Sequence, residues 1–147
     1  MKAKLIRKKA KDVTCNAPTN KKVNLKSKNE DLSHVLLAAE AAEDKKGENI
    51  VLLDVSKLTT VSDYFLVVTA NSTAQIQAIA KHVENTLKDL GLILVSKEGF
   101  VASNWVVVDF GNIVVHIMTE KERDYYKLER FWSNATIIDK KLWQKAS

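Results

Sequence analysis

The sequence has one cysteine, one proline and four glycines in 147 residues, and it lacks any long hydrophobic run. Because Cys15 is the only thiol, an internal disulfide framework and a zinc site built from several cysteines are excluded. No apolar run approaches the roughly 20 residues that span a bilayer, and the N-terminus shows no secretory signal pattern. We therefore expect a protein of a reducing compartment, located in the cytoplasm and without a membrane partner.

Motifs that bind cofactors or metals are equally scarce. The glycines form no phosphate-binding loop, and three of them stand where helix ends or turns require glycine. Asn71-Ser72 could present helix amides to an anion, but a plain helix N-cap also explains the pair. The histidines have no second ligand at metal-binding spacing; they are His34, His82 and His116. We expect no metal ion and no cofactor.

One short pattern suggests catalysis. Ser62-Asp63, just before an expected strand, resembles the start of nucleotidyltransferase active sites. Such sites require two or three carboxylates that converge on metal ions. The sequence has no Asp-x-Asp pair and no Gly-Ser phosphate loop. We therefore expect no enzymatic activity, with a nucleotidyltransferase-like, nucleotide-binding enzyme using Asp63 and Asp109 as the alternative.

The net charge of +5 is unevenly distributed along the chain. Residues 1–30 hold 10 Lys or Arg against 2 acids, whereas residues 31–147 hold 13 against 16. Residues 1–30 also contain the only proline and little periodicity, which predicts a basic, disordered arm. Three roles remain open for this arm: a solvated tail, an RNA-binding segment that releases phosphate counterions, or a transit peptide for a mitochondrion or plastid.

Hydrophobic periodicity predicts one α/β domain at residues 31–135 and a tail at 136–147, which adds a short helix around Leu142 and Trp143. The expected order is helix 31–46, strands 50–55 and 64–69, helix 72–91, strand 92–96, hairpin 104–119 and a helix from 119 through 131. This order predicts a mixed β-sheet with helices mainly on one face and open on the other.

Several residues mark the expected helix ends. Ser72-Thr-Ala-Gln75 and Thr119-Glu-Lys-Glu122 match capping boxes. Gly47 is expected to take the left-handed closing conformation of the first helix, and Gly91 to end the second. The aromatic residues of the last helix are expected mostly in the core; they are Tyr125, Tyr126, Phe131 and Trp132.

Residues 104–119 are the most informative segment. They form two apolar runs joined by Gly111-Asn112, a two-residue hairpin turn. Pairing across this turn places Val108 opposite Val115 and Val106 opposite Ile117, which creates one wholly apolar face. The alternate residues create a second face that mixes chemical types: Trp105, Val107, Asp109, Val114, His116 and Met118.

This mixed face admits three explanations: a second core layer, a catalytic surface or a docking surface. Asp109 and His116 are diagonal rather than direct cross-strand neighbours, which weakens a catalytic pairing. Trp105 and Met118 are direct cross-strand neighbours, and both residue types are enriched at protein interfaces. A helix that covers them would instead make them core. Trp105 and Met118 therefore favour a docking surface for a protein partner, with a core layer as the open alternative.

Motifs in several separate elements together resemble the ribosomal silencing factor (Iojap-like) family. They are Ser62-Asp63-Tyr-Phe, Gln75-Ile-Gln-Ala-Ile-Ala80, Val83-Glu84, Glu98-Gly99, Trp105-Val-Val-Val-Asp109, Gly111, Val114-Val-His116, Glu122-Arg123, Tyr126-x-Leu-Glu129 and Trp132. The resemblance covers about residues 32–135. The sequence departs from the family pattern at Asn71, where glycine is usual, and at Asn112, where aspartate is common. Its long basic arm also exceeds the usual short N-terminus. Asn112 can still adopt the left-handed turn conformation.

The resemblance implies a nucleotidyltransferase-like fold without catalytic carboxylates, and a homodimer. It implies binding to large-subunit ribosomal protein fourteen at the intersubunit face of the large ribosomal subunit. Such binding would sterically prevent small-subunit joining and repress translation, with a further role in late large-subunit assembly. By position, Trp105 and Asp109 would lie at this contact. We therefore expect the partner-binding residues to be Trp105, Val107, Asp109, His116 and Met118. An RNA-binding assembly factor that acts through the basic arm remains an alternative.

Overall fold

The computed structural model describes residues 25–60, 62–99, 104–127, 130 and 134–143, with side chains from residue 30 onward. Cys15 and most of the basic arm lie outside this range. The same holds for Leu128, Phe131 and Trp132, so the expected core positions of Phe131 and Trp132 are not tested. Within the described residues, the order of helices and strands agrees with the prediction, and a short strand is added near the C-terminus.

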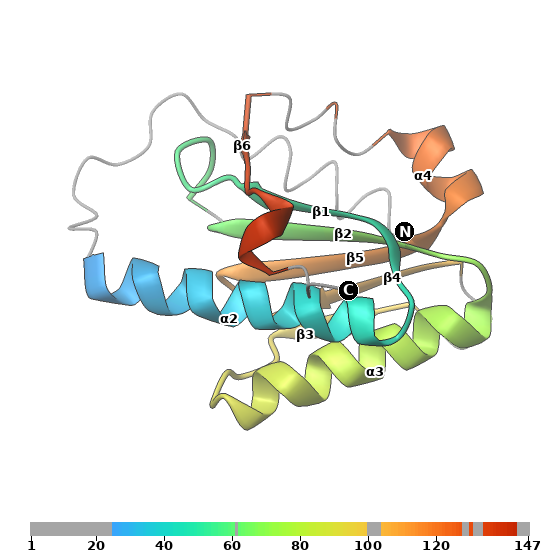
Figure 1. Cartoon of the computed structure of the whole chain (residues 1–147), viewed down its shortest axis with the longest axis horizontal. Helices are drawn as coiled ribbons and strands as arrows, with labels where there is room; N and C mark the ends of the chain where they lie inside the picture. The colour runs from blue at the N-terminus through green and yellow to red at the C-terminus, as the bar shows by residue number, and fades with distance from the viewer. Residues whose placement is uncertain (1–24, 61, 100–103, 128–129, 131–133, 144–147) are drawn as a thin grey trace.

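A six-stranded mixed sheet forms the centre of the molecule (Figure 1). Its order is β3-β4-β5-β2-β1-β6, with β2 and β5 parallel and the other neighbours antiparallel. The strands are β1 (Glu48–Asp54), β2 (Tyr64–Ala70), β3 (Ser96–Glu98), β4 (Trp105–Asp109), β5 (Ile113–Thr119) and β6 (Thr136–Ile137). The central strands β2 and β5 are buried on both faces and are mostly apolar, as expected for strands covered on both sides.

Two long helices, α2 (Leu25–Asp44) and α3 (Thr73–Asp89), cover one face of the sheet (Figure 1). The larger core cluster lies between them and the sheet and includes Ile76, Val83 and Leu87 from α3. The short helix α4 (Glu120–Tyr126) lies on the opposite side, and the 3₁₀ helix η2 (Lys140–Leu142) follows β6. The mixed α/β fold with its long helices on one face is therefore confirmed.

The expectation of an open second face is wrong. The side chains on this face form a second buried cluster, and Tyr126, Leu58 and Ala135 pack against it from outside the sheet. The prediction missed this layer because α4 contributes only one such side chain, which leaves no apolar periodicity to detect. Tyr125, expected in the core, is 79% exposed.

The boundaries of three elements also differ from prediction. The helix α4 ends at Tyr126 and not at Phe131, because Lys127 takes a left-handed C-cap conformation. The helix α2 begins at Leu25, six residues before the expected Asp31. The prediction missed its first turns because they are mostly polar and precede the apolar stripe that starts at Leu32. The strand expected at 92–96 is found at Ser96–Glu98 instead. Its ladder begins only where Ser96 meets Asp109 of β4, and Ile93 and Val95 remain largely exposed.

Two residues that were expected to adopt the left-handed backbone conformation, Gly47 and Asn112, do not adopt it. Lys46, with φ 66°, closes α2 in place of Gly47. Gly47 is needed for space, because a Cβ there would lie 2.6 Å from Val68 Cγ1. In the hairpin turn only Gly111 has positive φ, 86°, so Asn112 does not adopt the left-handed conformation. Gly91 ends α3 as predicted, with φ 92° and its N–H donating to the Lys88 carbonyl.

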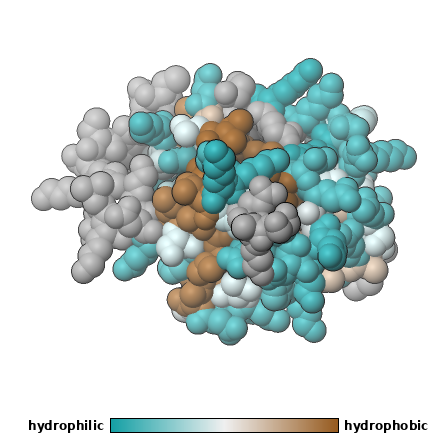
Figure 2. Space-filling model, in the orientation of Figure 1, coloured by the Kyte–Doolittle hydropathy of each residue, from teal (hydrophilic) through white to brown (hydrophobic). Residues whose placement is uncertain are grey.

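The outer surface is mostly hydrophilic on the face seen in Figure 2, apart from a hydrophobic band near its middle. Five large apolar side chains have more than half of their area exposed. They lie before β3, on α4 and in the segment of β6 and η2: Ile93, Val95, Tyr125, Ile137 and Leu142. No helix in the described part of the chain is both long and apolar enough to cross a bilayer.

Candidate functional site: the mixed face of the β4–β5 hairpin

The β4–β5 hairpin has the predicted register. Trp105 pairs with Met118, Val107 with His116, and Asp109 with Val114. The N–H of Phe110 donates to the Ile113 carbonyl at 2.9 Å and closes the turn. The expected docking residues therefore share one face of two adjacent strands, and Asp109 and His116 are diagonal neighbours, as predicted.

All five expected docking residues are buried in the chain. Trp105 is 4% exposed, Asp109 8%, and Val107, His116 and Met118 1% or less. With residues of β1 and β2, the apolar members form the second cluster: Leu53, Val55, Phe65, Val67, Trp105, Val107, Val114 and Met118. In the free chain this face is thus a second core layer, one of the three explanations left open by the sequence.

Aromatic rings connect this layer to α4. The Trp105 ring lies 4.7 Å from the Tyr126 ring and 6.2 Å from the His116 ring, measured between centroids. The His116 ring lies 5.3 Å from that of Phe65 on the neighbouring strand. Tyr125 meets Tyr126 edge to face at 4.9 Å. A row of rings therefore extends from the sheet through Trp105 and Tyr126 to the exposed Tyr125.

Asp109 is engaged in the hairpin turn. Its Oδ1 accepts the N–H of Gly111 at 2.7 Å, an aspartate-type turn that stabilises the abrupt reversal of the chain. Its backbone carbonyl accepts the N–H of Val95 at 2.8 Å, which ties the segment before β3 to β4. A structural role for this carboxylate follows directly from these contacts.

Arg123 of α4 is a site residue that the sequence reasoning did not single out, although it belongs to one of the quoted motifs. Its Nη1 donates to Thr69 Oγ1 at 2.7 Å and to the carbonyl of Asn49. Thr69 is 1% exposed, so this guanidinium reaches a buried hydroxyl on β2. The available signal was its position one helical turn after the Thr119 N-cap, which points its side chain back toward the sheet.

A polar cavity of about 330 Å³ lies where α4 meets β1 and β2. It is lined by Asn49, Val51, Thr69, Glu120, Arg123, Asp124, Lys127 and Lys140. Its lining holds three cationic side chains and two carboxylates, a net charge of +1, which is too small an excess to identify a ligand.

Carboxylates gather at the end of the sheet where β2 begins. Burial, followed by the nearby Asp54, Asp63 and Asp31, raises the pKa of Tyr64 to about 12. Burial and the neighbouring Asp63 raise the pKa of Asp31, whose Oδ2 accepts from the Asn112 amide at 3.3 Å. Each group is therefore held toward its protonated form by lost hydration and by like charge.

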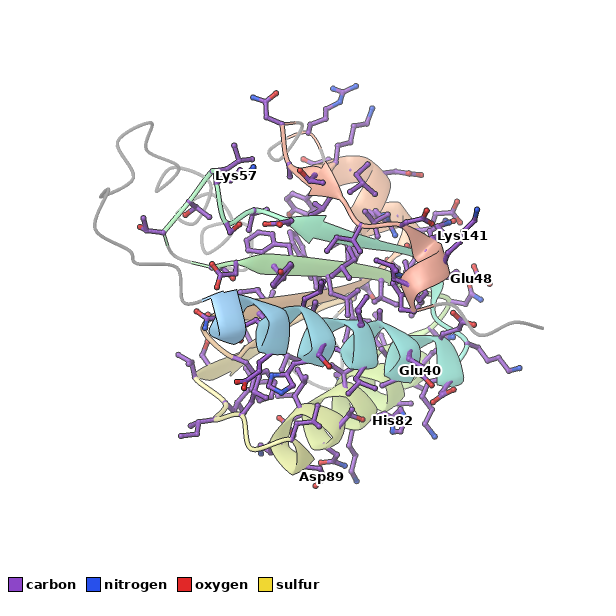
Figure 3. The ribbon with its side chains drawn as sticks, turned by 60° about the vertical axis from the view of Figure 1, so that its left-hand side comes forward. Glu40, Glu48, Lys57, His82, Asp89 and Lys141 are labelled. Atoms are coloured by element: carbon purple, nitrogen blue, oxygen red, sulfur yellow. The ribbon has the colours of Figure 1, made fainter. Side chains whose placement is uncertain are left out.

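These carboxylates do not assemble a metal centre. In the described ranges, no three His, Cys, Asp or Glu side chains are grouped so that they could hold a metal ion. Asp63 adjoins the hairpin turn, where its N–H donates to the Asn112 carbonyl at 2.9 Å. His82 lies on α3, on the helical side of the sheet (Figure 3), 3.8 Å from Asp44.

Comparison with known proteins identifies the family. Residues 27–147 match the family model described as ribosomal silencing factor during starvation. The chain is 41% identical over 103 residues to the ribosomal silencing factor of Bacillus subtilis, covering 70% of this chain and 87% of that protein. It is 31% identical over 107 residues to the mouse protein named mitochondrial assembly of ribosomal large subunit protein 1, covering 71% of this chain and 45% of that protein.

A solved structure agrees with these matches. The crystal structure of a Chromobacterium violaceum protein superposes with a TM-score of 0.67 at 40% sequence identity, covering 79% of this chain and 89% of that chain. The family match includes the C-terminal segment with β6 and η2, which the sequence prediction treated as a separate tail. This chain belongs to the ribosomal silencing factor family.

Proposed function

We propose that this protein represses translation by binding the large ribosomal subunit and blocking its association with the small subunit. The observation that carries the proposal is the family match across residues 27–147, which spans every described helix and strand except the first two residues of α2. The names of its bacterial relatives refer to ribosome silencing, and that of the mouse relative to large-subunit assembly. Steric blocking requires affinity alone, so the protein acts without catalysis.

We propose large-subunit ribosomal protein fourteen as the direct partner, and the mixed face of β4 and β5 as the contact. Trp105, Val107, His116 and Met118 lie on one face of these strands and include aromatic and thioether groups, the residue types that concentrate binding energy at interfaces. They are buried in the free chain, so binding at this face requires that its cover move aside. Asp109, at the end of β4, supplies a carboxylate at the rim for a basic group of the partner. A homodimer in the unbound state and a cytoplasmic location are part of the same proposal.

A matched pair of tryptophan variants tests the contact. Trp105 and Trp143 are both buried, at 4% and 7% exposed, but they belong to opposite core layers. Trp105→Phe and Trp143→Phe should therefore lose similar stability. We expect Trp105→Phe to weaken binding to Bacillus subtilis large subunits by about tenfold or more, as for a central interface residue. Trp143→Phe should bind as the wild type does.

The measurements are co-sedimentation with large subunits and a subunit-joining assay on a sucrose gradient. The wild type should leave free large subunits where the untreated sample forms joined ribosomes. Normal joining in the presence of saturating protein would refute the proposed function. Equal binding by the two folded tryptophan variants would refute only the assignment of the contact to the mixed face.

A second candidate function is supported by the charge distribution. Residues 1–30 carry a balance of +8, whereas residues 31–147 carry −3. Such a separation suits a basic segment that contacts ribosomal RNA next to a domain that contacts protein. An RNA-binding role in large-subunit assembly would therefore depend on the arm and not on the β4–β5 hairpin.

A further inference from the structure

The helix α4 covers the mixed face with unusually few contacts. It has seven residues, none of which is buried, whereas α3 buries Ile76, Ile79, Ala80, Val83 and Leu87. Helices in proteins gain most of their stability from packing an apolar face, and a helix of seven residues is marginal without it. The attachment of α4 must therefore depend on a small number of specific contacts.

One side chain of α4 covers Trp105. The Tyr126 ring lies 4.7 Å from the indole at an angle of 51°, a tilted aromatic contact. Tyr125 points outward and is 79% exposed, so it adds a ring against Tyr126 but no cover over the sheet. Removal of α4 would thus take away the ring that stacks on Trp105, beside its cross-strand neighbour Met118.

Arg123 connects α4 to the sheet. Its guanidinium donates to Thr69 on β2 and to the carbonyl of Asn49 on β1, so one residue ties the helix to two strands. These contacts stand beside the polar cavity that separates α4 from the start of β1. Hydrogen bonds from a charged donor are stronger than neutral ones, which makes Arg123 the principal polar attachment.

The end of α4 favours release. Lys127, the C-cap residue, has φ 45° and ψ 55°, a left-handed conformation that is strained for a residue with a Cβ atom. Displacement of α4 would allow Lys127 to leave this conformation. Strain of this kind persists only while the surrounding contacts outweigh it.

We propose that α4 is a displaceable cover, latched by Arg123 to Thr69 and Asn49, and that the ribosomal partner takes its place on Trp105. This inference rests on the proposed function and explains how a buried face serves as a docking surface. Only the open state binds, so the apparent Kd equals the intrinsic Kd divided by the open fraction. A weaker latch increases that fraction and strengthens binding.

The test compares Arg123→Met with Lys121→Met in the full-length protein. Both variants remove one positive charge from α4 and keep an unbranched side chain, but Lys121 is exposed and lies outside the latch. Hydrogen–deuterium exchange of the free proteins reports the opening of α4. We expect faster exchange at residues 120–126 in Arg123→Met and unchanged exchange at residues 73–89, which also shows that the domain remains folded.

Binding to Bacillus subtilis large subunits gives the second measurement. We expect Arg123→Met to bind about tenfold more tightly than the wild type, and Lys121→Met to bind equally. Faster exchange with unchanged or weaker binding would overturn the cover, because α4 would then be irrelevant to the contact or part of it. Unchanged exchange would overturn the latch. If neither the wild type nor Arg123→Met binds large subunits, the proposed function and its partner are refuted. The hydrogen–deuterium exchange of residues 120–126 then still shows whether Arg123 latches α4.

Discussion

At the residue scale, Asp109 shows how a side chain of the proposed contact also serves the fold. The sequence identified it as a carboxylate on an apolar strand, and the structure places its Oδ1 2.7 Å from the Gly111 N–H. A charged acceptor strengthens such a hydrogen bond, and the bond holds the only positive-φ residue of the turn in place. A contact of Asp109 with the proposed partner must therefore be compatible with this hydrogen bond.

This arrangement predicts different effects for two substitutions of Asp109. Asp109→Ala should lower the free energy of unfolding by about 1–3 kcal/mol, because the Gly111 N–H loses a charged acceptor. Asp109→Asn retains a side-chain oxygen and should lose about half as much or less. Urea titration followed by circular dichroism measures both values. Equal stability of Asp109→Ala and the wild type would contradict the structural role.

Gly47 and Arg123 illustrate what the sequence could not reveal at this scale. Glycine at the end of a helix usually marks a left-handed residue, but here Lys46 adopts that conformation. The requirement for Gly47 comes from Val68 on β2, a neighbour in space and not in sequence. Arg123 was part of a recognised motif, yet its role depends on Thr69 and Asn49, which lie more than 50 positions earlier.

At the element scale, helix ends and the hairpin register could be predicted because their causes are local. Ser72 Oγ accepts the N–H of Gln75 at 3.1 Å, as a capping box requires. The register of β4 and β5 follows from a two-residue turn and from alternating apolar residues. The strand β3 was misplaced because its start depends on where the chain meets Asp109, which periodicity cannot indicate.

The joint between α2 and α3 was also not foreseen. Gln75 Oε1 accepts the Asn71 N–H at 2.7 Å, instead of the N–H of the cap residue itself. Its Nε2 donates to the carbonyls of Lys45 and Lys46, at 3.1 and 2.9 Å. One glutamine therefore caps the start of α3 and also satisfies carbonyl groups in the turn that follows α2.

We expect Gln75→Ala to lower the free energy of unfolding by about 1–2 kcal/mol, since three hydrogen bonds at a partly exposed site are lost. Asn85→Ala is a suitable control, because Asn85 is exposed on the same helix and alanine has the higher helix propensity. Thermal and urea unfolding of both variants provide the comparison. A loss no greater than that of Asn85→Ala would show that Gln75 does not join the two helices.

At the scale of the whole molecule, the sheet separates two core layers of different strength. The layer under α2 and α3 is extensive, whereas the layer on the mixed face is covered, within the described residues, by few side chains from outside the sheet. This asymmetry suits a protein that must retain its fold while one face exchanges cover for a partner. The basic arm adds a further separation, because its positive charge adjoins a mildly acidic domain.

Deletion of residues 2–24, which hold eight Lys or Arg and one Asp, tests the arm. We expect the deletion to reduce the salt dependence of large-subunit affinity, because each phosphate contact contributes roughly 0.7 to 0.9 to the slope of log K against log salt concentration. A variant with a scrambled arm of the same composition should keep the wild-type slope. The measurement is co-sedimentation at several salt concentrations, and an unchanged slope would assign the arm no RNA contact.

The sequence by itself determined the mixed sheet, the order of its helices and strands, the hairpin register and the family. Each of these follows from local periodicity, turn chemistry or the motifs quoted above. Only the tertiary structure decided that Trp105 and its neighbours are buried and that Arg123 donates hydrogen bonds to Thr69 and Asn49. Burial is decided by which segments pack together. Contacts such as Tyr126 on Trp105 and Arg123 on Thr69 join distant positions that no local pattern connects.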